Sequence, residues 1–412
     1  MDVRNVDVLI IGAGPAGSVA AGIVNKSGLN ILVVEKEKFP RFVIGESLLP
    51  RCMEALEEAE LLDAVKEKGF QEKFGAKFVR GEEFCDFNFI EQFTEGYNWT
   101  WQVPRGDFDN TLAQEIIRKG VSVEFETTVI DIKFEGSNST TTVIDKTGKT
   151  YKINAKFIID SSGYGRVIPR LFNLDKPSNL PPRKSMFAHI KDPHRSKYIE
   201  PNRILVLVHQ PKTWIWIIPF STGVSSLGFV ASPEFFDEHK DKSTDEQLRF
   251  LINSEPHLKE RFGDQDFVFE PKILEGWSVT TEQFFGEGFV LTGNVTEFLD
   301  PMFSSGVTLA TASSQKAANL VVRKLKGEEI DWQEEFVNPT MKGVDVFRTY
   351  VMGWYDGDLH DIFFSKDINP DFKKQICSVL AGYVWDTTNP FVRKHERAVK
   401  SLAEVIRINN RK

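Results

Sequence analysis

The sequence predicts an α/β protein that combines a mainly parallel sheet with an antiparallel sheet and a helical C-terminal region. A buried strand runs into a glycine-rich turn at residues 6–17, strand-like runs separated by turn signals fill residues 187–230, and the pattern turns helical after residue 330. The predicted domain boundaries are 1–74, 101–181 and 271–330 for the parallel-sheet domain, 75–100 and 182–270 for the antiparallel domain, and 331–412 for the helical region.

The parallel sheet is predicted to begin in the stretch VDVLIIGAGPAG, residues 6–17. The apolar, β-branched run from Val6 to Ile11 is typical of a buried parallel strand. The glycines that follow have the G-x-G-x-x-G spacing, which provides a tight turn, close approach of the backbone to a pyrophosphate, and close packing of helix on strand. A second strand, NILVVE, ends in an acid at the distance expected for binding ribose hydroxyls. The sequence therefore predicts a Rossmann-like dinucleotide site formed by Gly12, Gly14, Pro15, Ala16, Gly17 and Glu35.

The antiparallel sheet is predicted from four runs with short turns between them: FAHI (187–190), ILVLVHQ (204–210), TWIWIIPF (213–220) and VSSLGFV (224–230). These runs read as a meander. Residues 73–81 and 84–89 are predicted to add strands to the same sheet. Trp214 and Trp216 alternate along one run, so both point to one face of the strand. Such a pair is by itself more often core packing than anything else.

Composition and charge exclude several classes of protein. The chain of 412 residues has a formal net charge of −8, which argues against nucleic acid as a partner because phosphate binding needs a basic face. No apolar run approaches the roughly 20 residues that span a bilayer. Cys52, Cys85 and Cys377 are far apart, with no CxxC pair and no histidine cluster at metal spacing. We therefore expect no metal site, no membrane span and a cytoplasmic location.

Further segments identify the dinucleotide by resemblance. FPRFVIGESLLP (39–50), VPRGDFDNTLA (103–113), FIIDSSGYGR (157–166) and GNVTEFLDPMFSSGVTLATASSQKAA (293–318) resemble the spaced motifs of flavin-binding enzymes of the aromatic hydroxylase type. The resemblance implies FAD as cofactor. It also implies that the antiparallel sheet is a substrate domain above the flavin. The additional cofactor-binding residues that it implies are Arg41, Ser47, Arg105, Val129, Asp160, Gly293, Asn294, Gly306 and Val307.

A more specific resemblance lies in the tryptophan run. Trp214-x-Trp216-x-Ile218-Pro219 matches the W-x-W-x-I-P signature of flavin-dependent halogenases, and Lys73 and the loop at residues 301–306 complete the pattern. The resemblance implies that the indoles keep the substrate away from the flavin. It further implies that Ser305 and Gly306 hold a halide ion, and that Lys73 handles hypohalous acid on its way to an electron-rich aromatic. Phe303 stands where the free-tryptophan halogenases carry a glutamate, which favours phenol, pyrrole or carrier-bound substrates.

Other readings of the same residues stay open. An aromatic monooxygenase or a reductase of prenyl double bonds, of the geranylgeranyl reductase type, would share the flavin motifs without needing Lys73. A flavoprotein that has lost catalysis is a further alternative. Lys73 by itself reads as an ordinary solvated lysine, with Lys77 nearby as a second candidate.

The expected partners follow from the halogenase resemblance and from the tail. No second G-x-G-x-x-G is present, so a dedicated NADPH domain is not expected and a separate flavin reductase is. The substrate is expected to be a small aromatic, free or tethered to an acyl or peptidyl carrier protein. Residues 393–412 hold seven Lys/Arg against two glutamates, typical of a solvated helix or of a docking surface for an acidic carrier.

Overall fold

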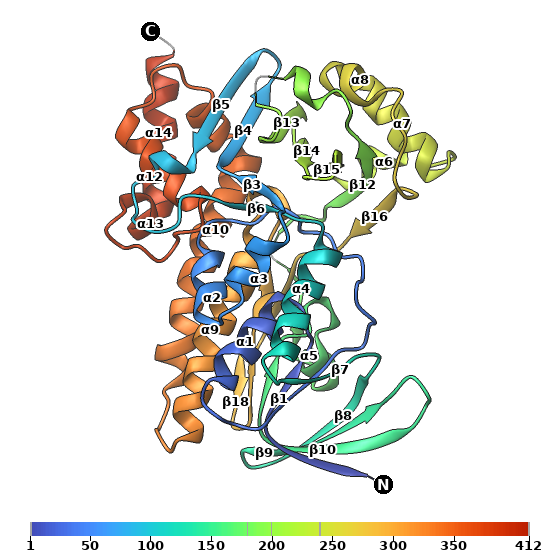
Figure 1. Ribbon diagram of the computed structural model, residues 1–412. Helices are drawn as coiled ribbons and strands as arrows, with labels where there is room; N and C mark the ends of the chain where they lie inside the picture. The colour runs from blue at the N-terminus through green and yellow to red at the C-terminus, as the bar shows by residue number, and fades with distance from the viewer. Residues whose placement is uncertain (1, 179, 199, 239, 411–412) are drawn as a thin grey trace.

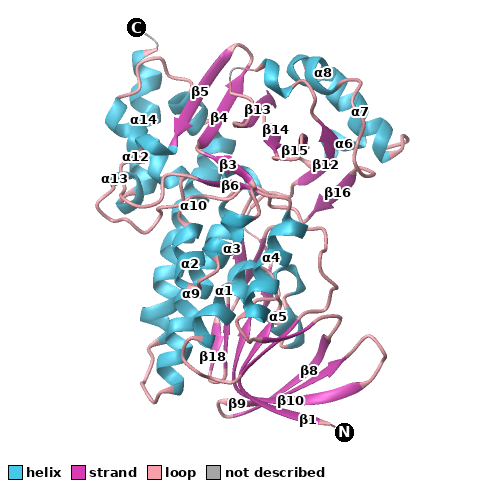
Figure 2. Ribbon diagram, viewed as in Figure 1, coloured by secondary structure: helices cyan, strands magenta, loops and turns pink. Residues whose placement is uncertain are grey.

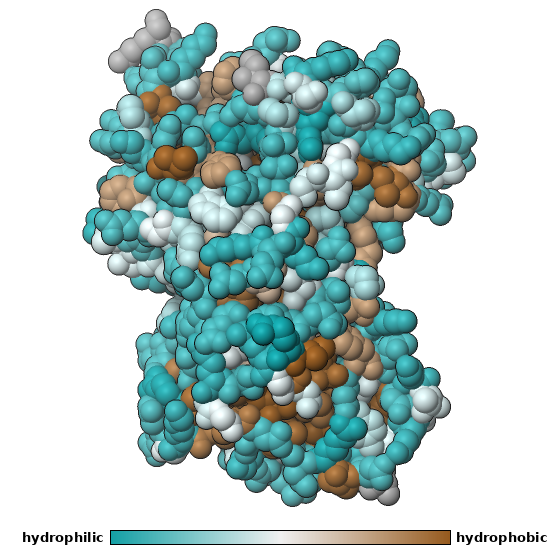
Figure 3. Space-filling model, in the orientation of Figure 1, coloured by the Kyte–Doolittle hydropathy of each residue, from teal (hydrophilic) through white to brown (hydrophobic). Residues whose placement is uncertain are grey.

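The computed structural model describes residues 2–178, 180–198, 200–238 and 240–410. The chain forms two lobes, with the N-terminus at the free end of the lower lobe and the C-terminal helices in the upper one (Figures 1 and 2). The molecule is narrower where the two lobes meet (Figure 3). The mixed helix and strand content confirms the predicted α/β class. Arg411 and Lys412, counted in the basic tail, lie outside the described residues.

A mainly parallel sheet forms the centre of the lower lobe, in the order β18-β19-β10-β1-β2-β7. Neighbouring strands from β19 to β7 pair in parallel. The β8–β9 hairpin adds to the sheet through β9, which pairs antiparallel with β10. The predicted first strand is the buried end of β1, and β2 ends directly before Glu35. The strands are β1 (Val3–Ile11), β2 (Ile31–Val34), β7 (Ser122–Glu124), β8 (Thr128–Glu135), β9 (Asn138–Ile144), β10 (Thr150–Asp160), β18 (Phe285–Gly286) and β19 (Phe289–Leu291).

Helices cover one face of this sheet. Val8 and Ile10 of β1 pack with α1 and α9, whereas Leu9 and Ile11 pack on the opposite side with residues of the β8–β9 hairpin and α5. The alternation explains why β1 reads as a continuous apolar run, since both faces are buried. The helices of this lobe are α1 (Pro15–Asn25), α2 (Cys52–Glu58), α3 (Leu62–Glu67), α4 (Arg105–Arg118), α5 (Val167–Leu171) and α9 (Ser305–Leu325).

The upper lobe contains a mainly antiparallel sheet in the order β16-β12-β15-β14-β13-β4-β5. The four predicted runs all form strands, but the meander consists of β13, β14 and β15 only, because β12 pairs with β15 rather than with β13. Its strands are β4 (Gly75–Arg80), β5 (Glu83–Asn88), β12 (Lys184–Lys191), β13 (Ile204–Gln210), β14 (Thr213–Pro219), β15 (Val224–Ala231) and β16 (Lys272–Glu275).

The prediction that residues 73–81 form one strand of this sheet is wrong at its first residue. Lys73 ends β3 (Gln71–Lys73), which pairs antiparallel with β6 (Thr100–Gln102) in a separate ribbon, and β4 starts only at Gly75. Lys73 pairs with Thr100 in this ribbon and so belongs to no strand of the large sheet. A separate three-stranded sheet contains β11 (Asp175–Lys176), β17 (Val279–Thr281) and β20 (Glu297–Phe298).

The two faces of the antiparallel sheet contact different partners. Trp214, Trp216 and Ile218 share one face as predicted, and they belong to the core formed with the C-terminal helices. Ile215 and Ile217 alternate onto the other face, against α6–α8. The predicted helical region is present at the upper left of Figure 1. The upper-lobe helices are α6 (Pro233–Asp237), α7 (Thr244–Ser254), α8 (Pro256–Phe262), α10 (Asn338–Asp356), α11 (Asp358–Phe363), α12 (Pro370–Leu380), α13 (Pro390–Arg393) and α14 (His395–Asn409).

Candidate functional site

A cavity of about 570 Å³ extends from the glycine loop after β1 to the tryptophans of β14. Residues from both lobes line it, so it lies where the parallel and antiparallel sheets approach each other. The cavity brings together most of the residues proposed from sequence. Those that line it are Gly12, Gly14, Pro15, Ala16, Glu35, Arg41, Ser47, Arg105, Val129, Trp214, Trp216, Asn294, Gly306 and Val307.

The glycine-loop end has the geometry of a dinucleotide site. Gly12 has a φ of +98°, in the left-handed region that favours glycine. A Cβ on Gly17 would lie 1.8 Å from the Gly12 carbonyl oxygen, so Gly17 serves helix packing and does not reach the cavity lining. Within the described chain no side chain caps α1, and the free N–H groups at its N-terminus suit a phosphate.

Glu35 completes this end of the cavity. One carboxylate oxygen accepts a hydrogen bond from Ala13 N at 2.9 Å and the other accepts from Glu37 N at 2.9 Å. The side chain is therefore held at the tip of β2, beside the loop that receives the pyrophosphate, where an acid binds ribose hydroxyls. The uncapped helix, the glycine turn and the fixed acid together fit an adenine dinucleotide such as FAD.

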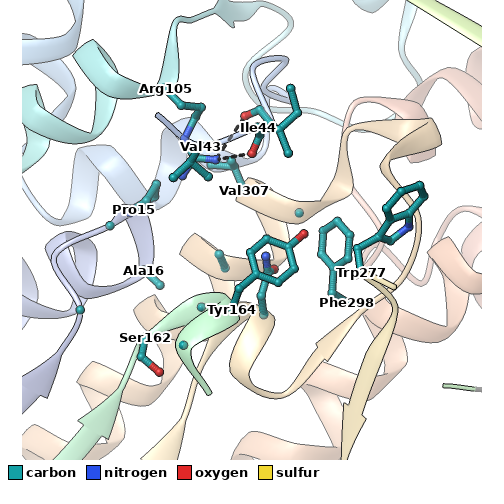
Figure 4. A pocket seen from close by; sticks show the side chains of 18 of the residues that line it. Pro15, Ala16, Val43, Ile44, Arg105, Ser162, Tyr164, Trp277, Phe298 and Val307 are labelled. Atoms are coloured by element: carbon teal, nitrogen blue, oxygen red, sulfur yellow. Dashed lines mark hydrogen bonds between the residues drawn. The ribbon is translucent and has the colours of Figure 1, made fainter. Parts of the chain in front are cut away.

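Two arginines hold the segment of residues 41–47 along the cavity. Arg105 forms a bidentate ion pair with the buried Asp109 at 2.8 and 3.0 Å, and Arg41 donates to the same carboxylate at 2.9 Å. Arg105 Nη1 also donates to the carbonyl oxygens of Ile44 and Gly45 at 3.3 and 3.4 Å (Figure 4). Both arginines are thus engaged within the protein, and they fix the position of the lining segment.

Besides Gly17, two residues proposed as cofactor contacts, Asp160 and Gly293, lie outside the cavity lining. Asp160 accepts from Ser162 N at 3.0 Å and from Ile168 N at 2.8 Å, so its carboxylate stabilises the turn after β10 and the start of α5. Burial raises the pKa of this carboxyl. Gly293 has a φ of +61° and donates from its N–H to Ser313 Oγ at 2.9 Å, which positions the next residue, Asn294, at the cavity. Asp160 and Gly293 therefore do not line the cavity and instead fix the backbone of segments beside it.

Trp214 and Trp216, the tryptophan wall, close the upper end of the cavity. Their ring centroids are 6.0 Å apart. Trp214 Nε1 donates to Tyr355 Oη at 3.0 Å, and Trp216 Nε1 donates to Ser226 Oγ at 3.0 Å. A Cβ on Gly228 of the neighbouring strand would lie 2.3 Å from the Trp216 ring, so only glycine leaves room for that indole. Both indoles are held by packing and by hydrogen bonds.

The loop before α9 approaches the cavity next to the tryptophan wall. Asp300 accepts from Met302 N at 3.0 Å and from the Tyr355 hydroxyl at 3.0 Å, and burial raises the pKa of its carboxyl to about 6. Ser304 has a φ of +57° at the start of α9. Gly306 lines the cavity, whereas Ser305 is buried outside the lining. The structure thus favours Gly306 over Ser305 as the residue of this loop that faces a ligand.

Lys73 is buried, with only 2% of its surface exposed, which overturns the reading of a solvated lysine. Its Nζ donates to Ser47 Oγ at 2.7 Å and to the Leu48 carbonyl oxygen at 2.8 Å. Burial, with a smaller contribution from the charge of Arg203, lowers the pKa of its ammonium to about 7. Lys73 lies outside the cavity lining but touches Ser47, which belongs to it. Lys77 forms an ion pair with Glu200 instead.

Several cavity residues were not proposed from sequence. Tyr164 and Phe298 form an edge-to-face pair with centroids 5.5 Å apart, and Trp277 lies beside them (Figure 4). Tyr355 lies outside the cavity lining but contacts the tryptophan wall from the end of α10. Glu46 lies inside the quoted GES segment and contacts His189 of β12. No local spacing relates these residues, because strands distant in sequence bring them together.

The fold and this cavity define a dinucleotide-dependent protein of the FAD-binding type, and comparison with known families agrees. The family model described as an FAD binding domain matches residues 5–329. The chain therefore belongs to this family, and it is an FAD-dependent enzyme of the oxidoreductase type. In the described residues no helix combines the length and apolar character needed to cross a bilayer.

Individual relatives narrow the class. A brominase of 1H-pyrrole-2-carbonyl-peptidyl-carrier protein from Pseudoalteromonas luteoviolacea is 28% identical over 93% of each chain. The corresponding chlorinase from Pseudomonas fluorescens is 26% identical over 93% of this chain and 91% of its own. A crystal structure described as a flavoprotein/dehydrogenase from Cytophaga hutchinsonii is 58% identical, covers 99% of this chain and 100% of its own, and superposes with a TM-score of 0.97. A flavin-dependent brominase structure is 25% identical, covers 97% and 99%, and has a TM-score of 0.86. These findings confirm the resemblance to flavin-dependent halogenases.

Proposed function

We propose that the protein is a flavin-dependent halogenase that acts on an electron-rich aromatic, with chloride or bromide and with electrons from a separate flavin reductase. The observation that carries the proposal is the pairing of a tryptophan wall on the cavity with a buried lysine just beyond it. Trp214 and Trp216 line the cavity, while Lys73 lies behind Ser47. An enzyme that hydroxylates or reduces its substrate beside the flavin has no need of such a lysine.

FAD, when bound and reduced, would supply electrons that reduce oxygen. The halide supplies the remaining electrons and is thereby oxidised to hypohalous acid. The tryptophan wall fills space that an aromatic substrate would otherwise take, so the small acid has to diffuse to a substrate held elsewhere. The backbone at Gly306, at the N-terminal end of α9, is suited to the halide. Lys73 can hydrogen-bond hypohalous acid as an ammonium, or react with it as a neutral amine to form a haloamine. A pKa of about 7 makes both forms available near neutral pH.

A carrier-tethered substrate is the second part of the proposal. Relatives that span almost the whole chain act on a pyrrole attached to a peptidyl carrier protein. Arg393, Lys394, Arg397 and Lys400 of α13 and α14 are exposed. In contrast, Arg407 forms ion pairs with Asp358 and Asp361 of α11, which stabilise the packing of α14. The exposed cations form a basic surface that suits an acidic carrier, since opposite charge accelerates encounter.

Charge reversal tests the carrier surface. The variant R397E/K400E is expected to weaken carrier binding, measured by surface plasmon resonance between 50 mM and 300 mM salt. The matched control is Lys133→Glu, which reverses an exposed charge on β8 at the opposite end of the molecule (Figure 1). Carrier binding that ignores both salt and R397E/K400E would contradict the docking surface, and a free substrate would then be the better proposal.

The halogenase itself is tested by halide dependence. The purified protein is supplied with FAD, a flavin reductase, NADH, oxygen and bromide, and a panel of phenols, pyrroles and resorcinols, free and carrier-bound. We expect products with the paired isotope peaks of bromine, and none when bromide and chloride are omitted. The same product with and without halide would reject the halogenase.

A dehydrogenase or reductase is the second candidate, because the 58% identical structure is described as a flavoprotein/dehydrogenase. That reading predicts flavin turnover with an organic electron donor or acceptor and indifference to halide. An aromatic monooxygenase predicts oxygen in the product in place of halogen. Mass spectra of the halide-free reactions distinguish these alternatives, because reduction, hydroxylation and halogenation change the product mass differently.

A further inference from the structure

A carboxylate–imidazole pair lies on the cavity and has no part in the function described so far. Glu46 is 1% exposed, and its Oε1 lies 2.6 Å from His189 Nε2. Its other oxygen, Oε2, is buried and has no hydrogen-bond partner among the described residues. Glu46 is also one of the residues that line the cavity. A buried carboxylate oxygen without a partner costs free energy, so a ligand or a proton in the cavity is its natural partner.

His189 connects this carboxylate to the outside. Its ring packs against Phe42, Phe220 and Phe269, with centroid distances of 5.8, 5.0 and 4.8 Å, while 13% of its side chain remains exposed. An imidazole can accept a proton on one ring nitrogen while it releases one from the other. The hydrogen bond to Glu46 on one side and the exposed part of the ring on the other give a path of proton-carrying atoms from solvent through His189 and Glu46 to the cavity.

Other charged groups near the pair are engaged elsewhere. Arg105 of α4 is paired with Asp109 and bonds the carbonyl oxygen of Gly45, the residue before Glu46. The Lys272 ammonium of β16 lies over the Phe42 ring, 4.8 Å from its centroid. Among the described residues, neither cation forms a hydrogen bond or ion pair with the Glu46 carboxylate. His189 is therefore its proton-exchanging contact.

The chain contains a second pair with the same chemistry. His209 Nδ1 lies 2.7 Å from Glu255 Oε2, and its ring also packs against phenylalanines. The His209 side chain is 16% exposed, similar to the 13% of His189, whereas the Glu255 side chain is 12% exposed and that of Glu46 is fully buried. Neither residue lines the cavity. The two pairs differ in where the carboxylate faces, which makes His209–Glu255 a matched control.

We propose that Glu46 and His189 form a proton relay into the flavin cavity, which rests on the proposed halogenase function. Fully reduced FAD, oxygen, one halide ion and one proton give oxidised FAD, hypohalous acid and water. Each turnover thus consumes a net proton inside the cavity. Hydroxylation or double-bond reduction with the same reduced cofactor is balanced without that proton. A halogenase therefore needs a route for protons that a flavin-dependent hydroxylase or double-bond reductase does not need.

The relay balances at each step. His189 takes a proton from solvent on Nδ1 and passes the Nε2 proton to Glu46 Oε1. Rotation of the neutral carboxyl group about its Cγ–Cδ bond brings this proton to the cavity side, where it leaves and a carboxylate remains. His189 is then neutral with its proton on Nδ1. A turn of the ring about its Cβ–Cγ bond returns an N–H to the Glu46 side and a free ring nitrogen to the solvent side, which accepts the next proton. Glu46 and His189 carry protons only, and the electrons come from the reduced cofactor.

The test uses the 412-residue enzyme with FAD, a flavin reductase, NADH, bromide and oxygen, and follows hypobromous acid with a halogen-accepting dye. Glu46→Gln keeps a hydrogen bond to His189 but cannot exchange a proton, so we expect formation of hypobromous acid to fall about 100-fold at pH 8. The rate is expected to recover as the pH is lowered, and the wild type is expected to show a solvent deuterium isotope effect. His189→Ala should be rescued by added imidazole, which a purely structural role would not allow. Glu255→Gln should behave as wild type.

FAD affinity, measured by fluorescence quenching, provides the readout that does not depend on turnover. It is expected to stay within about threefold of wild type in Glu46→Gln, which shows an intact cavity. Wild-type rates of hypobromous acid formation in Glu46→Gln, or a loss that neither acid nor imidazole rescues, would overturn the relay and leave the halogenase standing. A wild-type enzyme that makes no halogenated product would overturn the proposed function and the relay together.

Discussion

Lys73 is expected to make the stability of the protein depend on pH in a way that a single substitution removes. Burial lowers the pKa of its ammonium from the ordinary 10.5 to about 7 in the folded protein. Between these two values the unfolded chain binds a proton that the folded protein does not, so the stability contributed by this residue rises with pH by about 1.4 kcal/mol per pH unit. Below pH 7 the full cost of the buried charge is present. The pKa difference puts this cost at about 5 kcal/mol at most. The hydrogen bonds to Ser47 and Leu48 favour the ammonium and so reduce it.

Lys73→Met keeps an unbranched side chain only one atom shorter and removes the group that carries the charge. Urea unfolding of the flavin-free wild type and variant, followed by circular dichroism from pH 6 to pH 9.5, measures the difference in stability. We expect the advantage of the Met variant to be greatest at pH 6 to 7 and to shrink steadily toward pH 9.5. Lys77→Met, at the position paired with Glu200, controls for loss of a lysine from the same segment. A wild-type to Lys73→Met difference that stays constant over this range would refute the buried, readily deprotonated lysine.

Two further predictions concern a residue on the cavity and one behind its tryptophan wall. Asn294 lines the cavity with a neutral amide, and a charged acceptor bonds more strongly than a neutral one, so Asn294→Asp should tighten FAD binding about fivefold by fluorescence titration; unchanged affinity would show that the side chain does not touch the cofactor. Tyr355→Phe removes the hydroxyl shared by Trp214 and Asp300 and should cost about 1–3 kcal/mol of stability and lower the halogenated product formed per flavin oxidised. Tyr350→Phe on the same helix is its control, because that buried hydroxyl has no partner among the described residues and its loss should be close to neutral; equal effects of the two variants would contradict the role given to Tyr355.

The parts of the fold that sequence predicts best are those with a local signature. The G-x-G-x-x-G turn, the apolar β1 and the acid after β2 lie within 30 residues and recur in the structure as predicted. The alternation of Trp214 and Trp216 correctly placed both on one face. Strand order was less accessible, because β12 joins β15 across a long connection that no local pattern records.

The chemistry of the site depended on contacts that sequence does not contain. Lys73 looked like a surface lysine, and only the β3–β6 ribbon turns it inward against Ser47. Asp160 matched a motif, yet the turn that follows β10 takes both of its carboxylate oxygens. The Glu46–His189 pair joins positions 143 residues apart, so no spacing could have suggested it.

The most direct measurement of the central claim compares wild type with Lys73→Ala in the same bromide-fed reaction, by product mass spectrometry together with stopped-flow spectra of the flavin. We expect brominated aromatic from the wild type. For Lys73→Ala we expect normal FAD binding and normal flavin reoxidation, with free hypobromous acid or hydrogen peroxide in place of brominated product. Lys73→Arg should recover little, since a guanidinium stays protonated and cannot form a haloamine. Full bromination by Lys73→Ala, or an oxygenated product from the wild type, would contradict this claim.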